Sequence, residues 1–351
     1  MTEPSALRPQ TMEQDRFWSL KLLWIFADGN YVATAATDGK AMSGFEDPET
    51  YRTILESLQT GICVVDLRRR ILLWSDGAEQ ITGYLRHEVV GHECIDNLLP
   101  HCNQAGCEMC GDHCPLNAAT REFKPVESLG FLHHKAGHRT PVHMWSAPAR
   151  DARGSIIGVI QSFYNQRYVP SPDRRDGNRG TWVDAATGVA NQAMIHSHLR
   201  ETLGTFAELS VPFAVVRVRW DELDHFRANY GPEAAASALQ VVAQTLENSL
   251  RPTDFVGRWG EDQFLAILTA CSEAGLPAVC ERIRRMVKSG GITWWGSELP
   301  VGKISLGSAL AQAGDTFESL MARTERGLAE RSGARKAASA GTGSQGSSSR
   351  D

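Results

Sequence analysis

The apolar run Phe264-Leu265-Ala266-Ile267-Leu268, preceded by the polar stretch Arg258-Trp259-Gly260-Glu261-Asp262-Gln263, decides the fold of the C-terminal half of this chain. Its length and composition predict a strand. A second apolar run, Phe213 to Val218, and two amphipathic helices, Ala234 to Leu250 and Glu273 to Lys288, alternate with it. This order predicts a sheet layered with helices, which is an α/β arrangement.

The N-terminal half has a different order of elements. Tyr51 to Leu58 has helical spacing, Gly61 to Asp66 predicts a strand, and Ile71 to Trp74 predicts its antiparallel partner. A short helical stretch and three more strand-like runs follow, the last ending at Ile156 to Phe163. We therefore expect a second, α+β domain built on an antiparallel sheet.

A length of 351 residues suits two domains. Residues 168–180 are rich in Pro, Asp, Arg and Gly, which predicts a linker between a domain at 51–167 and one at 181–334. Residues 1–50 form an N-terminal extension to which the sequence assigns no role. Residues 335–351 are mostly Ala, Gly and Ser with scattered charge, a composition that predicts a disordered tail.

The net charge and the hydropathy pattern restrict the classes of partner and the location that we expect for this protein. A net charge of -5 offers no broad cationic surface, which argues against nucleic acid as the main partner. The apolar stretch Leu20 to Ala27 is too short to span a bilayer, and the first residues lack the basic-then-apolar order of a secretory signal. We expect a cytoplasmic protein that does not enter a membrane.

Two motifs in the C-terminal half resemble those of GGDEF domains. The octapeptide Asp184-Ala185-Ala186-Thr187-Gly188-Val189-Ala190-Asn191 is similar to the family's D-x-L-T-G-L-x-N entry motif. Residues 258–264 resemble its R-Y-G-G-D-E-F hairpin, and Val301 to Ala309 resembles a later V-S-I-G strand. A final helix is expected at Phe317 to Glu330, so the resemblance covers about 181–330.

This resemblance implies a nucleotidyl-cyclase-like sheet flanked by helices and a diguanylate cyclase, which joins two GTP molecules into cyclic di-GMP within a dimer. The reaction needs Mg²⁺ held by acidic oxygens. Aligned without a gap, the family's metal-binding strand Asp falls at Arg219, and the hairpin acid survives as Asp262. The second hairpin Gly is Glu261, and the next acid is Gln263. A guanidinium in place of a carboxylate opposes cation binding by about 4 kcal/mol at ~4 Å and an effective dielectric near 20.

Three further family positions depart from the pattern. The guanine-reading Asn and Asp fall at Arg227 and Ala236, and the phosphate-binding Lys of the last helix falls near Ser332. These losses predict a degenerate catalytic site. An alternative register with a short deletion would restore an acid from Asp221 or Asp224, and the domain would then be an active cyclase that uses Mg²⁺.

One family feature is intact. Arg251-Pro252-Thr253-Asp254 stands five residues before the hairpin glycine Gly260 and matches the R-x-x-D site through which the family resembles a cyclic di-GMP receptor. An Arg fork grips phosphate bidentately or stacks on guanine, and an Asp accepts hydrogen bonds from the guanine edge. The alternative is that Arg251 and Asp254 form an ordinary solvated turn.

The N-terminal domain resembles a PAS domain over Tyr51 to Asn165. The resemblance rests on the strand at Gly61 to Asp66, on Trp74-Ser75-Asp76-Gly77-Ala78, on Thr82-Gly83-Tyr84, and on His133 to His138 before the last strands. It implies a five-stranded antiparallel sheet that gathers small ligands or partner surfaces.

A cysteine segment interrupts this domain. Cys107-x-x-Cys110 and Cys114 supply thiolates at the short spacing that zinc or an iron–sulfur cluster needs. His101, Cys94 or Cys102 is the candidate for the fourth ligand. The segment resembles a C-x3-C-P-L insert found in some PAS domains attached to GGDEF domains. The alternatives are thiol redox sensing and reduced cysteines that only pack.

These observations leave three functional hypotheses. In the leading one, the PAS domain registers a redox or metal signal, and the degenerate GGDEF domain receives cyclic di-GMP or passes the signal to another signalling protein. The second is an active diguanylate cyclase that converts GTP. The third is a scaffold, in which both domains serve dimerisation with cognate signalling proteins. A homodimer is expected in each case.

Overall fold

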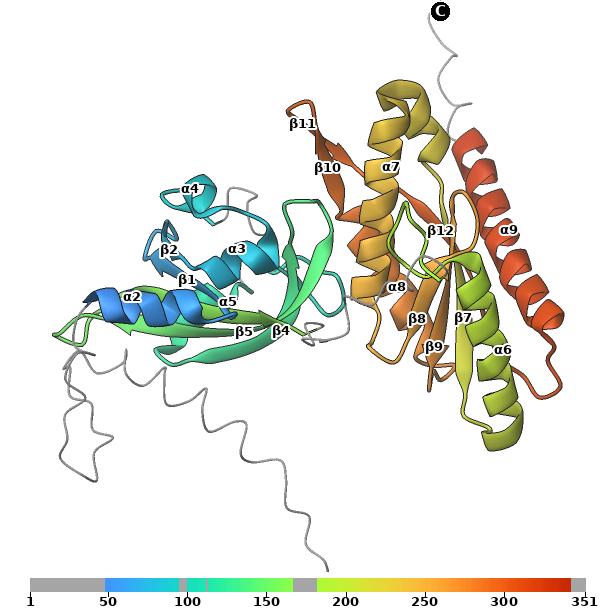
Figure 1. Cartoon of the computed structure of the whole chain (residues 1–351), viewed down its shortest axis with the longest axis horizontal. Helices are drawn as coiled ribbons and strands as arrows, with labels where there is room; N and C mark the ends of the chain where they lie inside the picture. Colours follow the sequence, from blue (N-terminus) through green and yellow to red (C-terminus); the bar gives the residue numbers. More distant parts are fainter. Residues whose placement is uncertain (1–47, 95–99, 112, 167–181, 342–351) are drawn as a thin grey trace, which may run out of the picture.

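The computed structural model describes residues 48–94, 100–111, 113–166 and 182–341, which fold into two domains (Figure 1). The predicted linker at 168–180 and nearly all of the predicted N-terminal extension lie outside these ranges. None of the helices in the described part of the chain combines the length and apolar composition needed to cross a bilayer.

The first domain is an antiparallel sheet with helices packed along it. The strands run in the order β2-β1-β6-β5-β4-β3. The five predicted strands are present, and a two-residue strand from the cysteine segment, β3, adds to the edge beside β4. The elements are α2 (Pro48–Ser57), β1 (Gly61–Asp66), β2 (Ile71–Trp74), α3 (Asp76–Thr82), α4 (Arg86–Val89), β3 (Cys102–Asn103), α5 (Pro115–Glu122), β4 (Val126–His133), β5 (Arg139–Arg150) and β6 (Ile156–Asn165).

Local sequence sets the ends of α3. The hydroxyl of Ser75 caps its N-terminus by accepting from the Ala78 N–H at 3.2 Å, and it also accepts from the Ile62 N–H of β1 at 2.8 Å. Gly83 ends the helix with a φ of 74°, a left-handed conformation that glycine adopts without strain. The motif between Trp74 and Tyr84 therefore fixes α3 against β1.

The second domain is a four-stranded antiparallel sheet in the order β12-β7-β9-β8, with a separate hairpin made by β10 and β11. Its elements are α6 (Gln192–Leu209), β7 (Phe213–Trp220), α7 (Leu223–Ser249), β8 (Phe255–Arg258), β9 (Gln263–Thr269), α8 (Leu276–Lys288), β10 (Gly291–Trp294), β11 (Ser297–Pro300), β12 (Ile304–Leu310) and α9 (Phe317–Gly341).

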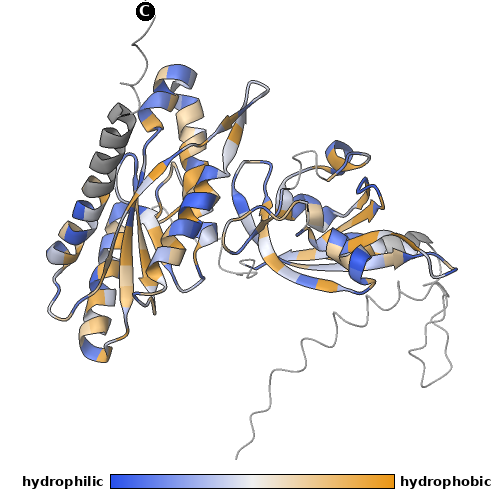
Figure 2. Ribbon diagram, turned by 180° about the vertical axis from the view of Figure 1, so that it is seen from behind, coloured by the Kyte–Doolittle hydropathy of each residue, from blue (hydrophilic) through white to orange (hydrophobic). Residues whose placement is uncertain are grey.

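Helices cover both faces of this sheet (Figure 1). Because side chains alternate along a strand, Val216 and Val218 of β7 enter the core with α7 and α8, whereas Phe213 and Val215 enter the core with α6 and α9. Figure 2 shows the apolar colouring concentrated on the central strands. The predicted layering of sheet and helices is confirmed.

The bounds of several helices differ from the predictions by one to three residues, and two boundaries differ by 11 residues. Helix α7 begins at Leu223 rather than Ala234, because a kink at Gly231, with a φ of 85°, joins an earlier turn to it. The predicted end of the last helix at Glu330 is wrong, since α9 runs to Gly341 through the part assigned to a disordered tail. The alanines there have high helix propensity, which the composition argument did not weigh. Residues 342–351 lie outside the described ranges.

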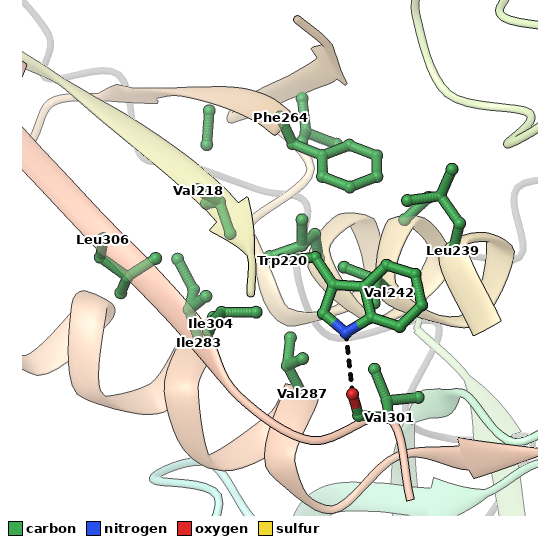
Figure 3. Close-up of a cluster of buried hydrophobic side chains, with 14 of the residues drawn as sticks. Val218, Trp220, Leu239, Val242, Phe264, Ile283, Val287, Val301, Ile304 and Leu306 are labelled. Atoms are coloured by element: carbon green, nitrogen blue, oxygen red, sulfur yellow. Dashed lines mark hydrogen bonds between the residues drawn. The ribbon is translucent and has the colours of Figure 1, made fainter. Parts of the chain in front are cut away.

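Trp220 is the centre of the larger core of the second domain (Figure 3). Its side chain is 1% exposed and lies among Phe264 of β9, Leu239 of α7 and Val287 of α8. The indole N–H donates to the Val301 carbonyl oxygen at 2.8 Å. This bond ties the end of β7 to the segment before β12.

We expect Trp220→Phe to lower the free energy of unfolding by about 1–3 kcal/mol, because the buried Val301 carbonyl loses this donor and a small cavity forms. Urea denaturation of the full chain measures it. Trp295→Phe is the matched control, since Trp295 is 93% exposed. Equal stability of the two variants would contradict the assigned role of Trp220.

Candidate functional site

The two motifs that carry the GGDEF resemblance contact one another. The guanidinium of Arg258 donates to the Asp184 carboxylate at 3.1 Å, and the Arg258 N–H donates to the Ala190 carbonyl oxygen at 2.7 Å. The same guanidinium donates to the carbonyl oxygens of Gly260 and Glu261 at 3.0 and 2.9 Å. The entry motif therefore holds the backbone of the hairpin turn through Arg258.

Asp184 is ionised in this arrangement. Partial burial by itself would raise its pKa, but hydrogen bonds from Thr187 and Arg258 outweigh burial and hold the pKa of the carboxyl below its usual value. Asn191 ends the motif and caps α6 by accepting from the Met194 N–H at 3.0 Å. The entry motif, Asp184 to Asn191, thus holds the hairpin in place and caps the N-terminus of α6.

Arginines line the edge of the β7 face beside the hairpin. The register places Arg219 of β7 opposite Gln263 of β9 and Ser305 of β12. Arg217 lies two residues earlier on the same face, and its Nε donates to the Gln263 side-chain oxygen at 2.8 Å. Its guanidinium also pairs with Glu325 of α9 at 3.5 Å. Gln263 is therefore engaged by a cation.

Asp221 follows the residue of β7 that pairs with the hairpin acid Asp262 through the backbone. The N–H of Trp220, the preceding residue, donates to the Asp262 carbonyl oxygen at 2.8 Å. The Asp221 carboxylate, however, accepts from the Arg219 guanidinium at 3.1 Å and from the Ser305 hydroxyl at 2.7 Å. Its charge is thus neutralised by the arginine that the resemblance places at the metal position. Asp224 lies in the first turn of α7.

Two other departures from the family pattern meet in space. Arg227 of α7 forms an ion pair with Glu261 of the hairpin at 2.5 Å, and both side chains are largely exposed. An exposed pair adds little stability, but it joins the hairpin to α7 across the positions that the resemblance assigns to guanine and phosphate. Ala236 is exposed on α7, and Ser332 lies within α9.

The R-x-x-D residues form a closed turn at the start of β8. The Asp254 carboxylate accepts from the Arg251 N–H at 2.9 Å and from the Thr269 N–H at 3.1 Å, and the Asp254 N–H donates to the Arg251 carbonyl oxygen at 3.0 Å. Asp254 therefore organises the turn and ties it to the end of β9. Arg251 is exposed at its surface.

Sequence reasoning missed Arg282 of α8, which joins this turn. Burial lowers the pKa of Arg282, and Asp254 and Arg251 are the charges that act on it, so the three side chains are neighbours. The Arg282 Nε is buried and has no hydrogen-bond partner within the described residues. No motif signals Arg282, because it lies 28 positions beyond Asp254 and only the packing of α8 brings it near.

The structure separates the predicted cysteine ligands into two groups. Cys94, Cys110 and Cys114 lie close together: Cys114 and Cys110 raise the pKa of Cys94, and Cys114 raises that of Cys110. The His101 Nδ1 lies 3.9 Å from the Cys110 sulfur. Cys107 points elsewhere and accepts from the Arg285 guanidinium of the second domain at 3.1 Å.

Burial favours the protonated thiol at two cysteines of this group, Cys94 and Cys110. Burial and the neighbouring Cys114 raise the pKa of Cys94 to about 12, and burial raises the pKa of Cys110. Protonated thiols are poor nucleophiles and poor ligands. His101 is buried with its Nε2 lacking a hydrogen-bond partner within the described residues.

The fit of this group to a metal ion is poor. No group of three His, Cys, Asp or Glu side chains in the described ranges is arranged to hold one. Asp112 and residues 95–99 fall outside those ranges. Zinc or an iron–sulfur cluster at Cys94, Cys107, Cys110, Cys114 and His101 stays a prediction, and Cys107 is the member that the geometry separates from the rest.

The β4–β5 hairpin carries three histidines toward the second domain. His134 and His138 stack with ring centroids 4.2 Å apart, and the His133 Nδ1 lies 3.1 Å from the Tyr84 hydroxyl oxygen. Together with side chains of α7, among them Glu247, the stacked pair lines a polar cleft of about 250 Å³ between the domains. Burial and nearby cationic groups lower the pKa of His133 to about 4 and that of His138 to about 3.

Comparison with known proteins assigns both domains. Residues 49–163 match the family described as PAS fold, and residues 181–336 match the family described as diguanylate cyclase, GGDEF domain. The chain therefore contains a PAS domain followed by a GGDEF domain, and the curated relatives that it resembles are named diguanylate cyclases. The predicted order of the two domains is confirmed.

Among the relatives, the probable diguanylate cyclase DgcE of Escherichia coli is 26% identical over 74% of this chain and 23% of its own length. Diguanylate cyclase DgcM of E. coli is 27% identical over 41% of this chain and 34% of its own. The chain thus spans between 23% and 34% of the length of these relatives. The GGDEF domain of DgcB from Caulobacter crescentus, solved in complex with c-di-GMP, is 21% identical over 46% of this chain and 93% of that one, with a TM-score of 0.41.

We expect the free energy of unfolding to fall as the pH is lowered from about 6.5 toward 4. Over this range His133 and His138 stay neutral in the folded chain but take up protons in the unfolded one, whose imidazoles titrate near the ordinary value of 6.5. Each unit of pKa difference contributes about 1.4 kcal/mol. Urea denaturation at several pH values measures the loss.

His138→Gln should flatten this pH dependence, because one of the depressed groups is removed. His87→Gln is the control, since His87 is exposed on α4. Equal slopes for the wild type and both variants would refute the assignment.

Proposed function

We propose that this PAS–GGDEF protein binds cyclic di-GMP at its R-x-x-D site and does not synthesise it. The proposal has a catalytic part and a binding part, which rest on different residues. Under this proposal the protein acts as a homodimer in the cytoplasm, where GTP and its cyclic products are available.

The observation that carries the catalytic part is the Arg219–Asp221 ion pair at the end of β7. A diguanylate cyclase needs Mg²⁺ between acidic oxygens, and Asp221 already shares its charge with a guanidinium and a hydroxyl. Gln263 replaces an acid and is bound by Arg217. A Mg²⁺ ion so close to the guanidinium groups of Arg217 and Arg219 would be strongly disfavoured.

The Glu261–Arg227 pair supports the same conclusion. A glutamate in the turn adds negative charge where a triphosphate would approach, and its partner Arg227 stands where the resemblance expects an amide that reads guanine. A nucleotide would have to break this pair before it reached the hairpin backbone.

The binding part rests on Arg251 and Arg282. The Asp254 carboxylate accepts from the backbone of Arg251 and Thr269, and Arg282 lies close enough to Asp254 and Arg251 for their charges to act on it. We assign the ligand's phosphates to the two arginines. Two guanidinium groups at one surface suit a dinucleotide, which has two phosphates to bind and two bases that stack. The Arg282 Nε lacks a partner in the described structure, and a phosphate oxygen would supply one.

Calorimetric titration of the full chain with cyclic di-GMP tests the binding part. We expect saturable binding, and a loss of affinity of at least about tenfold in Arg251→Ala and in Arg282→Ala, because each removes a charge-assisted contact worth about 1.5–3 kcal/mol. Arg121→Ala is the matched control, since Arg121 is an exposed arginine of α5 in the PAS domain.

Binding that survives both substitutions would mean that the ligand lies elsewhere. Absence of binding by the wild type would leave the R-x-x-D residues as a structural turn and would favour the scaffold hypothesis.

An active cyclase is the second candidate. The favouring observation is the backbone bond between Trp220 and Asp262, which puts Asp221 one residue from the hairpin acid. If the Arg219 side chain left Asp221, the two carboxylates would offer oxygens to Mg²⁺ from adjoining strands. Turnover of GTP separates this candidate from the proposal.

A further inference from the structure

The cysteine segment of the PAS domain is docked on helix α8 of the GGDEF domain. Cys102 is 2% exposed and is buried in a cluster with Phe131 of β4 and Met286 of α8. Five residues later the chain returns, and the Arg285 guanidinium donates to the Ala105 carbonyl oxygen at 3.3 Å and to the Cys107 sulfur at 3.1 Å. The Asn103–Cys107 turn is thereby fixed on α8.

Gly106 is the point of closest approach. A Cβ on this residue would lie 2.8 Å from the Arg285 Cβ and 3.5 Å from the Arg282 carbonyl oxygen, and its φ is 77°. Only glycine allows the turn to lie this flat on the helix. The turn therefore covers the backbone of Arg282, whose side chain belongs to the R-x-x-D site.

A second contact holds the C-terminal end of α8. The buried guanidinium of Arg139 donates to the Ser289 hydroxyl at 3.1 Å, to the Ser289 carbonyl oxygen at 3.2 Å and to the Pro100 carbonyl oxygen at 2.6 Å. A cation at a helix C-terminus is favoured by the helix dipole. Arg139 thus joins β5, the start of the cysteine segment and α8.

A third contact lies next to it. The Asn248 side chain of α7 donates to the Arg139 carbonyl oxygen at 2.8 Å. The Gly291 N–H meets the Gly137 carbonyl oxygen at 3.4 Å, and a Cβ on Gly137 would stand 1.6 Å from the Gly291 carbonyl oxygen. The domains leave no room for a side chain at Gly137.

We infer that cyclic di-GMP at the R-x-x-D site and the docking of the cysteine segment are coupled through α8, so that each stabilises the other. The inference rests on the proposed function. Its physical basis is that one helix serves both regions. The Arg282 side chain lies close enough to Arg251 and Asp254 for their charges to act on it, while the Arg282 and Met286 backbone and the Arg285 side chain contact the docked turn. A ligand that orders Arg282 favours the position of α8 to which the turn is fitted.

The coupling is reciprocal, because two events linked through one equilibrium change each other's free energy equally. Ligand binding therefore slows undocking of the cysteine segment, and a change that undocks the segment weakens ligand binding by the same factor. Any event that alters the cysteine segment in the PAS domain reaches the ligand site by this route.

Cys102 reports the docked state, since its thiol is buried between the domains. Its rate of alkylation by N-ethylmaleimide, followed by peptide mass spectrometry on the full chain, measures undocking. Cys63 in the PAS core and Cys280 in α8 are buried within single domains and report unfolding of each. Saturating cyclic di-GMP should slow alkylation of Cys102 about five- to tenfold in the wild type and leave it unchanged in Arg251→Ala.

Gly137→Ala tests the reverse direction, because its new Cβ collides with Gly291. We expect faster alkylation of Cys102, unchanged Cys63 and Cys280, and a similar five- to tenfold loss of affinity for cyclic di-GMP. Gly154→Ala is the matched control: Gly154 also has a positive φ, 81°, in a turn of the PAS domain, but a Cβ there would meet open space. It should match the wild type in both measurements.

The outcomes separate the two proposals. Binding of cyclic di-GMP with no effect on Cys102 alkylation, or with unchanged affinity in Gly137→Ala, overturns the coupling and leaves the proposed function standing. Wild-type protein that does not bind cyclic di-GMP overturns both. Equal Cys102 alkylation in Gly137→Ala and Gly154→Ala overturns the docking itself.

Discussion

The antiparallel pairing of β7 with β9 is the constraint on which the GGDEF site depends. It sets Arg219 opposite Gln263 and brings the Trp220 N–H to the Asp262 carbonyl oxygen. The apolar side chains between these positions alternate into two cores, so a shift of one residue would expose Trp220 and bury an arginine. The register, and with it the cationic edge of the site, is therefore fixed by packing rather than by the site.

Helix α8 connects the R-x-x-D turn with the PAS domain. One part of it contributes Arg282 to the R-x-x-D turn, and another receives the cysteine segment and the Arg139 guanidinium of the PAS domain. The PAS domain touches the GGDEF domain directly: Cys102 packs on Met286, and the buried Arg139 donates to Ser289. These contacts give a physical route between the two sites.

Sequence motifs predicted both domains and the hairpin that carries Asp262, because those motifs are local and their spacing fixes their backbone. The ligand-binding roles of Arg251 and Asp254 stay predictions. The motifs did not predict Arg282 or the Arg285–Cys107 contact, since both depend on how distant elements pack. Spacing also grouped Cys107 with Cys110, although the turn directs it toward the other domain. The extended end of α9 was missed because composition was weighed without helix propensity.

The central claim is that the Arg219–Asp221 pair has replaced a metal-binding carboxylate, and GTP turnover tests it most directly. Purified full-length protein is incubated with GTP and Mg²⁺, with E. coli DosC, a diguanylate cyclase, as the positive control and Asp262→Asn as the control for contaminating activity. We expect cyclic di-GMP to form no faster with wild type than with Asp262→Asn. Rapid formation by the wild type that Asp262→Asn abolishes would contradict it.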